Sequence, residues 1–377
     1  APPSSYHKRT PQHTHIPSHH MRPTILPLSA ILAAALTATA CSASFTTSQP
    51  APHPQLHQQH DLHHWGVPGG NYSGITHIGS SRYALVSDKE DFNGWHEIDI
   101  SFHPSGDIKH VEYIGFHGDT IANVGARDAE GIVYVDNSVF ISAENDQQII
   151  EMDMNGRATL RQLEVPPCFG TTKIFGNCGF EALAYDRSQG IFWTTTEQGL
   201  RHDIEARTSV KNPVPTLLRL QSFGADLQPL AQYAYRTDAP QTTHATKYYG
   251  YGVPSMTVLN DSTLLVMERE LYMPEDYDGS ACFIKIFSVN TRHLTPLTDT
   301  TSLRLMPDSC FAKKELLVEF TTTVTRHGNK DYANYEGMCL GPLTKSGRQT
   351  LILVSDSQCR QATEHFQMKD NIRVIVL

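Results

Sequence analysis

The sequence predicts an all-β fold, a β-propeller of four-stranded antiparallel blades. A short unit recurs five times: a serine or glutamate precedes an apolar run, a turn follows, and a second apolar run ends in an acid. The anchor residues lie at positions 73, 130, 181, 255 and 336. Recurrence at a period of roughly 40–50 residues is typical of propellers and other repeat arrays. Two further strand-like runs follow the first and second units, and four strands make a propeller blade.

The intervals between the anchors are 57, 51, 74 and 81 residues. The last interval equals about two ordinary blades, so the sequence allows five or six blades. A β-sandwich in which the unit recurs by chance is the alternative fold. The acid at both ends of the hairpin favours the propeller, because a packed sandwich core would not need it.

The segment before the repeats predicts export. Residues 1–20 precede Met21 and look like an over-extended reading frame, so we exclude them from the fold. In residues 21–41, one positive charge is followed by a short apolar run and small residues directly before Cys41. This pattern resembles a bacterial lipoprotein signal, and the run is too short for a good membrane span. We expect lipidation of Cys41 and a cell-envelope lipoprotein of the periplasm or outer membrane, or plain secretion.

Residues 42–64 are rich in Ser, Thr, Pro, Gln and His, and we expect a flexible linker there. Its five histidines could bind a transition metal, but a solvated tether is the preferred interpretation because no frame of cysteines or carboxylates fixes them.

The repeats then fill a single domain over residues 65–377. Its units are expected at 65–117, 118–166, 167–238, 253–325 and from Asn334 onward. An insertion at 238–252 carries three tyrosines, which either cover a ligand or pack on the surface. The terminal run 371–377 is strand-like and is expected to pair near the start of the domain, since closure removes open sheet edges.

Six cysteines remain after Cys41, and an even number in an exported protein suggests disulfides. Fifteen pairings are possible. The expected pairs follow from closeness in sequence and then elimination: Cys168–Cys178, Cys339–Cys359 and Cys282–Cys310. Free buried thiols are the alternative.

The repeated acids predict a site at the central channel. The first strand of each blade lines that channel, so Glu130, Glu181 and Glu336 are expected to face it at similar depth. Ser73 and Ser255 take the same position in the other units. The second strands end in acids that should lie near one mouth: Asp88, Glu144, Glu197, Glu268 and Asp356. The alternative is that these acids accept backbone hydrogen bonds between blades and fix the repeat register.

A ring of like charges is unfavourable unless protons or a cation neutralise it. Hard oxygen ligands suit Ca²⁺ or another hard divalent cation, and no ordered Cys/His set points to zinc. The net charge of −9 argues against nucleic acid as a partner. The chain also lacks a G-x-S-x-G motif, a Walker loop and a dinucleotide fingerprint.

The motifs together resemble the phytase-like family described as "esterase-like activity of phytase". The resemblance covers about residues 65–377 and rests on these segments in order: Asn71–Ile75, Asp128–Ile132, Gly179–Leu183, Glu268–Glu270, Asn334–Met338 and Ser355–Asp356. Cys178 stands where the family often has arginine. The resemblance implies a propeller that hydrolyses phosphate or carboxylic esters of small molecules.

On that basis we expect a divalent cation to polarise the ester, with a free carboxylate as general base. Glu130, Glu181, Glu336 and Arg269 are the expected catalytic residues. Ser73, Lys89 and Arg269 are the expected substrate-binding residues, since the planar fork of an arginine suits phosphate. We expect a monomer that meets the membrane only through its lipid anchor. A non-catalytic binding propeller and a lactonase-like hydrolase are the alternatives.

Overall fold

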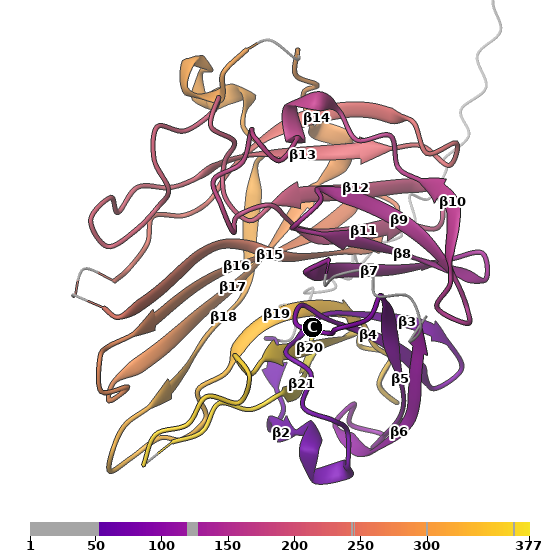
Figure 1. Cartoon of the computed structure of the whole chain (residues 1–377), viewed down its shortest axis with the longest axis vertical. Helices are drawn as coiled ribbons and strands as arrows, with labels where there is room; N and C mark the ends of the chain where they lie inside the picture. The colour runs from indigo at the N-terminus through magenta and orange to yellow at the C-terminus, as the bar shows by residue number, and fades with distance from the viewer. Residues whose placement is uncertain (1–52, 119–126, 243, 245, 299–300, 365) are drawn as a thin grey trace, which may run out of the picture. The chain divides into compact units, whose positions relative to one another are not determined.

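A computed structural model describes residues 53–377, apart from 119–126, 243, 245, 299–300 and 365. The predictions for residues 1–52, including the signal segment and Cys41, lie outside this part of the chain. The described chain is all-β, and its strands form five four-stranded antiparallel blades in a propeller ring (Figure 1). No helix among the described residues is long and apolar enough to cross a membrane.

The first three blades follow the chain, each with its strands in sequence order. Blade 1 holds β3 (Tyr72–Gly79), β4 (Arg82–Ser87), β5 (Gly94–Phe102) and β6 (Ile108–Gly118). Blade 2 holds β7 (Ala129–Val135), β8 (Ser138–Ala143), β9 (Gln148–Asp153) and β10 (Ala158–Gln162). Blade 3 holds β11 (Phe180–Asp186), β12 (Ile191–Thr196), β13 (Leu217–Phe223) and β14 (Pro229–Arg236), after the 3-10 turn η2 (Pro167–Phe169).

Blade 4 explains the longest interval between repeats. It holds β15 (Tyr248–Asn260), β16 (Thr263–Met273), β17 (Ser280–Asn290) and β18 (Lys314–Val324). These strands are long, and the β17–β18 connection carries the 3-10 turns η3 (Thr291–His293), η4 (Leu303–Leu305) and η5 (Asp308–Cys310). The 81-residue interval therefore contains no sixth blade. The tyrosines expected in a loop belong to β15 instead.

The last blade joins the two ends of the domain. It consists of β19 (Asn334–Leu340), β20 (Thr350–Asp356), β21 (Asn371–Val376) and the N-terminal β1 (Gln55–Leu56), while β2 (His60–Asp61) also pairs with β21. The predicted pairing of the terminal run near the domain start is confirmed. The prediction of a flexible linker is wrong for its described part, because this segment covers the edge of β21 and continues into η1 (Leu62–Trp65).

The blades pack through five clusters of buried apolar side chains, one at each blade boundary. Their inner strands form a closed ring, in which β3 contacts β7 and β19, and β11 contacts β7 and β15. Figure 1 shows the C-terminal β19 close to β3. Glycine permits this close approach: a Cβ on Gly74 would lie 2.5 Å from the carbonyl oxygen of Glu130 in the next blade.

The predicted disulfides are absent among the described residues, where Cys178, Cys282, Cys310, Cys339 and Cys359 are free thiols. Cys339 pairs with Ile352 near one end of the β19–β20 hairpin, whereas Cys359 follows the other end. At about 3.3 Å per residue that separation far exceeds the roughly 7 Å limit for bridged Cα atoms.

The other two pairs fail because their members face different surroundings. Cys282 is buried between blades 4 and 5, whereas Cys310 lies in η5 beside a Phe311 that packs on blade 3. The thiol of Cys178 accepts a hydrogen bond from Arg207, and that of Cys168 accepts one from Gln232.

The close approach of the inner strands predicts the effect of Gly74→Ala. The added methyl group overlaps a backbone carbonyl that is fixed by its own blade, so we expect the unfolding free energy to fall by about 1–3 kcal/mol in urea denaturation. Gly176→Ala is the matched control, since a Cβ there meets nothing within 4 Å. Equal stability of the two variants would contradict the packing argument.

Candidate active site

The channel-facing residues sit on β-bulges. Every inner strand shifts register against its partner at the repeated motif. In β11 the extra residue is Glu181, in β19 it is Glu336 and in β3 it is Ser73. A bulge leaves one residue outside the ladder and turns its side chain, and such bulges are common beside active sites. The Glu-Gly repeat is therefore the sequence of a bulge followed by a tight interstrand contact.

These bulges open onto a polar cavity of about 350 Å³ at one mouth of the channel. Eight acidic and three cationic side chains line it, so the acids outnumber the cations. The acids are Asp88, Asp128, Glu130, Glu144, Glu181, Glu197, Glu336 and Asp356, and the cations are Lys89, Arg207 and Arg269. All but one of the acids expected in this ring are present.

Glu268, which was predicted as a metal ligand, is the exception, because its side chain does not line the cavity. Side chains alternate between the two faces of a strand, and in β16 it is Arg269 that faces the cavity. The Glu268 carboxylate points away from it, accepting hydrogen bonds from Tyr235 (2.6 Å) and the amide of Asp238 (2.9 Å). Blade 4 thus contributes a cation where the other blades contribute acids.

Arg269 neutralises one side of the ring. Its guanidinium binds the carboxylate of Glu197 and lies 3.3 Å from that of Glu336. It also donates to the amide oxygen of Asn334 at 3.0 Å, and that amide donates to Glu336 at 2.7 Å. Desolvation is the largest effect on Glu336, and despite the opposing influence of Arg269 it raises the pKa of Glu336 to about 7.

Glu130 and Glu181 form no such ion pair among the described residues, although the charge of Arg269 lowers the pKa of Glu181 in part. Both are more than nine-tenths buried. In the part of the chain that the structure describes, neither carboxylate accepts a hydrogen bond or pairs with a cation. Burial first, and then the neighbouring acids, raise the pKa of both groups well above the ordinary value. A buried carboxylate in this state binds either a proton or a cation.

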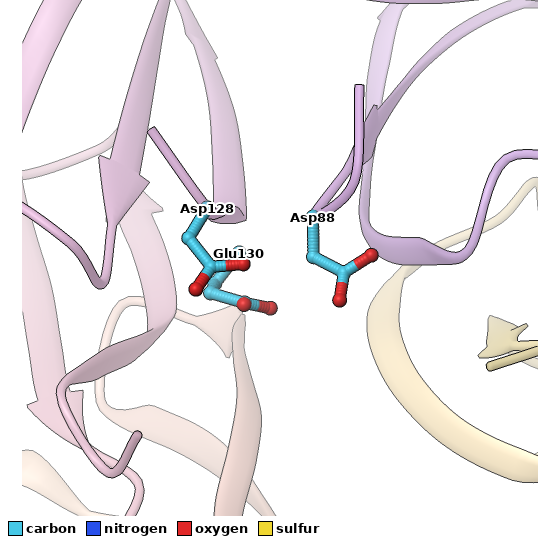
Figure 2. A group of neighbouring side chains, drawn as sticks. All are labelled: Asp88, Asp128 and Glu130. Atoms are coloured by element: carbon cyan, nitrogen blue, oxygen red, sulfur yellow. The ribbon is translucent and has the colours of Figure 1, made fainter. Parts of the chain in front are cut away.

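Two overlapping groups of acids fit a metal ion. Asp88, Asp128 and Glu130 bring one oxygen each within 4.8 Å of one another, and so do Glu130, Glu144 and Glu181. Figure 2 shows Asp88 of blade 1 facing Asp128 and Glu130 of blade 2. The Oδ1 atom of Asp88 is buried without a hydrogen-bond partner. Hard oxygen donors of this kind suit Ca²⁺ or Mg²⁺, so the residues present fit a divalent cation.

Other predicted residues have structural contacts. Ser73 donates to the carbonyl of Ala129 across the blade boundary (2.6 Å) and does not line the cavity; Ser255 is buried and does not line it either. Glu144 accepts the amide of Gly179 in the next blade at 2.5 Å, so the register-fixing role holds for this acid. Burial is the largest effect on Glu144 and raises its pKa to about 7, although the hydrogen bond from Gly179 lowers it.

Sequence reasoning missed several residues that line the cavity, among them Asp128, Arg207 and Asn334, whereas Tyr249 belongs to the insertion whose tyrosines were expected either to cover a ligand or to pack on the surface. Asp128 directly precedes the Ala129-Glu130-Gly131 segment of the second unit, so its place next to the motif was visible. Arg207 comes from the long loop inside blade 3 and reaches the cavity beside Cys178, the position where the family often has arginine. Only folding brings it there, because 29 residues separate the two.

The fold and site define a β-propeller with a carboxylate-lined cavity at its channel mouth. Residues 67–358 match the phytase-like family described as "Esterase-like activity of phytase". The match spans more than half of the chain, and the protein therefore belongs to this family. A comparison with curated proteins finds no match.

Several solved structures are similar to the chain. A streptogramin B lyase is 11% identical with a TM-score of 0.35, covering 86% of this chain and 98% of that chain. A thermostable family-43 glycoside hydrolase is 9% identical with a TM-score of 0.39, covering 81% and 90%. The PQQ-bound aldose sugar dehydrogenase from Streptomyces coelicolor is 9% identical with a TM-score of 0.36, covering 87% and 99%. These similarities carry no argument about activity.

The raised pKa values predict how stability depends on pH. Between the ordinary glutamate value of 4.5 and the folded-state values of about 7 or higher, the folded protein binds more protons than the unfolded chain. The unfolding free energy therefore falls as pH rises through this window. A pKa displacement of one pH unit corresponds to about 1.4 kcal/mol. We expect chelator-treated protein to lose stability between about pH 5 and 8 in urea denaturation.

Glu181→Gln isolates the contribution of one acid, because glutamine keeps the shape and removes the charge. In chelator, this variant should lose less stability over the same window and be the more stable protein at pH 8. A variant less stable than the wild type at pH 8 would show that the ionised carboxylate supports the fold.

Proposed function

We propose that this protein is an exported hydrolase of phosphate or carboxylic esters whose site is a divalent cation held by the channel-mouth carboxylates. The observation that carries the proposal is the pair of buried carboxylates, Glu130 and Glu181, that no hydrogen-bond donor contacts in the described part of the chain. Family membership supports the reaction class. We take Ca²⁺ as the cation to test first, because it tolerates irregular sets of oxygen ligands.

The proposed cation ligands come from blades 1, 2 and 3, where the two overlapping groups share Glu130. A bound divalent cation would polarise the ester oxygen and lower the pKa of a coordinated water. A bound cation would also favour an anionic substrate, since the ionised members of the eight acids would otherwise repel a phosphate.

Glu336 is the proposed general base. Its pKa of about 7 leaves it partly ionised at neutral pH, which suits proton transfer in either direction. It lines the cavity, and Asn334 and Arg269 hold its carboxylate in place. Because Arg269 already binds two carboxylates and an amide, we assign it as a positioning residue rather than as the group that holds the substrate.

The exposed Arg207 is the better candidate to bind an anionic substrate. Its Nη1 atom donates to the carbonyl of Gly176 and to the Cys178 thiol, and it meets no carboxylate among its hydrogen-bond partners. The guanidinium therefore lines the cavity with free donors for a phosphate or carboxylate. Tyr249 and Tyr248 line the same cavity and would contact an aromatic or apolar leaving group.

Export through residues 21–41, lipidation of Cys41 and a monomeric state complete the proposal. Export and lipidation derive from the sequence pattern before the propeller. Radiolabelled palmitate incorporation, with Cys41→Ser as the control, tests the anchor.

Charge-neutral variants test the chemistry. We expect Glu130→Gln, Glu181→Gln and Glu336→Gln to lower kcat/KM by about 10²-fold or more, since each removes a cation ligand or the base. Aryl phosphates, aryl esters, phytate and lactones, each with Ca²⁺ and with chelator, form the substrate panel. Thermal melting verifies that each variant folds.

Glu268→Gln is the matched control, because this buried glutamate belongs to the same motif but faces away from the cavity. It should retain activity. Turnover of lactones alone would indicate a lactonase-like hydrolase, and cation binding without turnover on any substrate would indicate a binding propeller.

Cation binding should also stabilise the fold. A ligand that binds only the folded state at 100 times its Kd adds about 2.7 kcal/mol to the unfolding free energy. We expect Ca²⁺ to raise the Tm of chelator-treated wild type at pH 8 and to have little effect on Glu130→Gln. An equal increase in both proteins would place the cation elsewhere.

A further inference from the structure

One of the three cationic groups that line the cavity is the ammonium group of Lys89. Its Nζ atom lies 2.5 Å from Oδ2 of Asp88 and 2.9 Å from Oδ1 of Asp128. These two acids belong to different blades, so the ammonium bridges the boundary between blades 1 and 2. The same two carboxylates, with Glu130, form one of the groups that fit a metal ion.

The cavity therefore contains two adjoining positions for a cation. The first, formed by Asp88, Asp128 and Glu130, has Lys89 bound to it; the second consists of Glu130, Glu144 and Glu181. Among the described residues, no lysine or arginine forms an ion pair with the second position. The two positions share one carboxylate but differ in whether the chain supplies its own cation.

Lys89 satisfies the first position only in part. It contacts one oxygen of Asp88, while the other, Oδ1, stays buried without a partner. Glu130 receives no hydrogen bond although it is more than nine-tenths buried. An ammonium group has three donors, whereas Ca²⁺ takes six to eight oxygen ligands. A divalent cation would therefore use the oxygens that Lys89 leaves unsatisfied.

We propose that Lys89 is a built-in competitor for the first cation position, neutralising Asp88 and Asp128 until a divalent cation displaces its ammonium group into solvent. This inference rests on the proposed cation centre but not on hydrolysis. It assigns Lys89 to the control of cation affinity instead of to substrate binding.

Lys89 is able to leave. Its side chain is 53% exposed, compared with 10% for Asp88 and 12% for Asp128. It sits just after β4, and a lysine ammonium is a strongly hydrated point charge on a flexible stem. Displacement therefore exchanges a partly hydrated ammonium for a divalent cation without moving a strand. Only the first position requires displacement of the Lys89 ammonium group, so a divalent cation should bind to the second position first.

Calorimetric titration of the full chain with Ca²⁺, after chelator treatment, tests this assignment. We expect two binding classes in the wild type. Lys89→Met should raise the affinity of the weaker class about tenfold, because the competing ion pairs are lost. Asp128→Asn should remove the weaker class and leave the tighter one.

Arg207→Met is the matched control, since it removes a cation from the same cavity that is bonded to none of these acids. It accounts for the general effect of one lost positive charge. Equal changes in affinity in the two variants, or no change in Lys89→Met, would overturn the competitor role. If neither the wild type nor Lys89→Met binds Ca²⁺, the proposed cation centre itself fails.

A second measurement uses the wild type alone. Acetic anhydride labelling followed by mass spectrometry reports how free each lysine is, and Lys109, an exposed lysine on β6, serves as the internal reference. Saturating Ca²⁺ should increase labelling of Lys89 several-fold relative to chelator while Lys109 stays constant. Unchanged or reduced labelling of Lys89 would contradict its displacement.

Discussion

Repulsion between carboxylates held at bulges is the constraint on which this site depends. The bulges turn Glu181 and Glu336 into the channel mouth, and the inner strands that carry them are packed backbone to backbone. The closed ring of inner strands and the buried apolar clusters at the blade boundaries hold these strands at a fixed spacing. The charge must therefore be reduced by protons or by cations, because the geometry cannot relax it.

Compensation is unequal around the ring. Arg269 of blade 4 neutralises Glu197 and Glu336, which lie in blades 3 and 5. Within the described part of the chain, Glu130 of blade 2 has no such partner, and the ammonium bonded to its neighbours Asp88 and Asp128 belongs to the half-exposed Lys89. A buried guanidinium is a permanent part of the fold, whereas an exposed lysine can be exchanged. This asymmetry places the exchangeable cation at blades 1 to 3.

The fold was largely predictable because each copy of the repeat corresponds to a β-bulge in the inner strand of a blade. A bulge needs a residue outside the ladder, and a close interstrand contact needs glycine, so the same short motif returns in several blades. The ring of acids followed from that periodicity. The orientation of Glu268 could not be predicted in this way, since the register of β16 against β15 decides whether Glu268 or Arg269 faces the channel. Arg207 reaches the cavity from a loop, and β1 comes from a segment of linker-like composition; neither leaves a periodic signal.

The acids without hydrogen-bond partners among the described residues also distinguish a ligand-binding role from a purely structural role. If the repeated glutamates only fixed the blade register, each would accept a backbone amide, as Glu144 does from Gly179. Glu130 and Glu181 accept nothing among the described residues, and burying an uncompensated carboxylate destabilises a fold. A chain that needed only stability would gain from glutamine at both positions. The retained charge is therefore best explained by a ligand that the ionised groups bind.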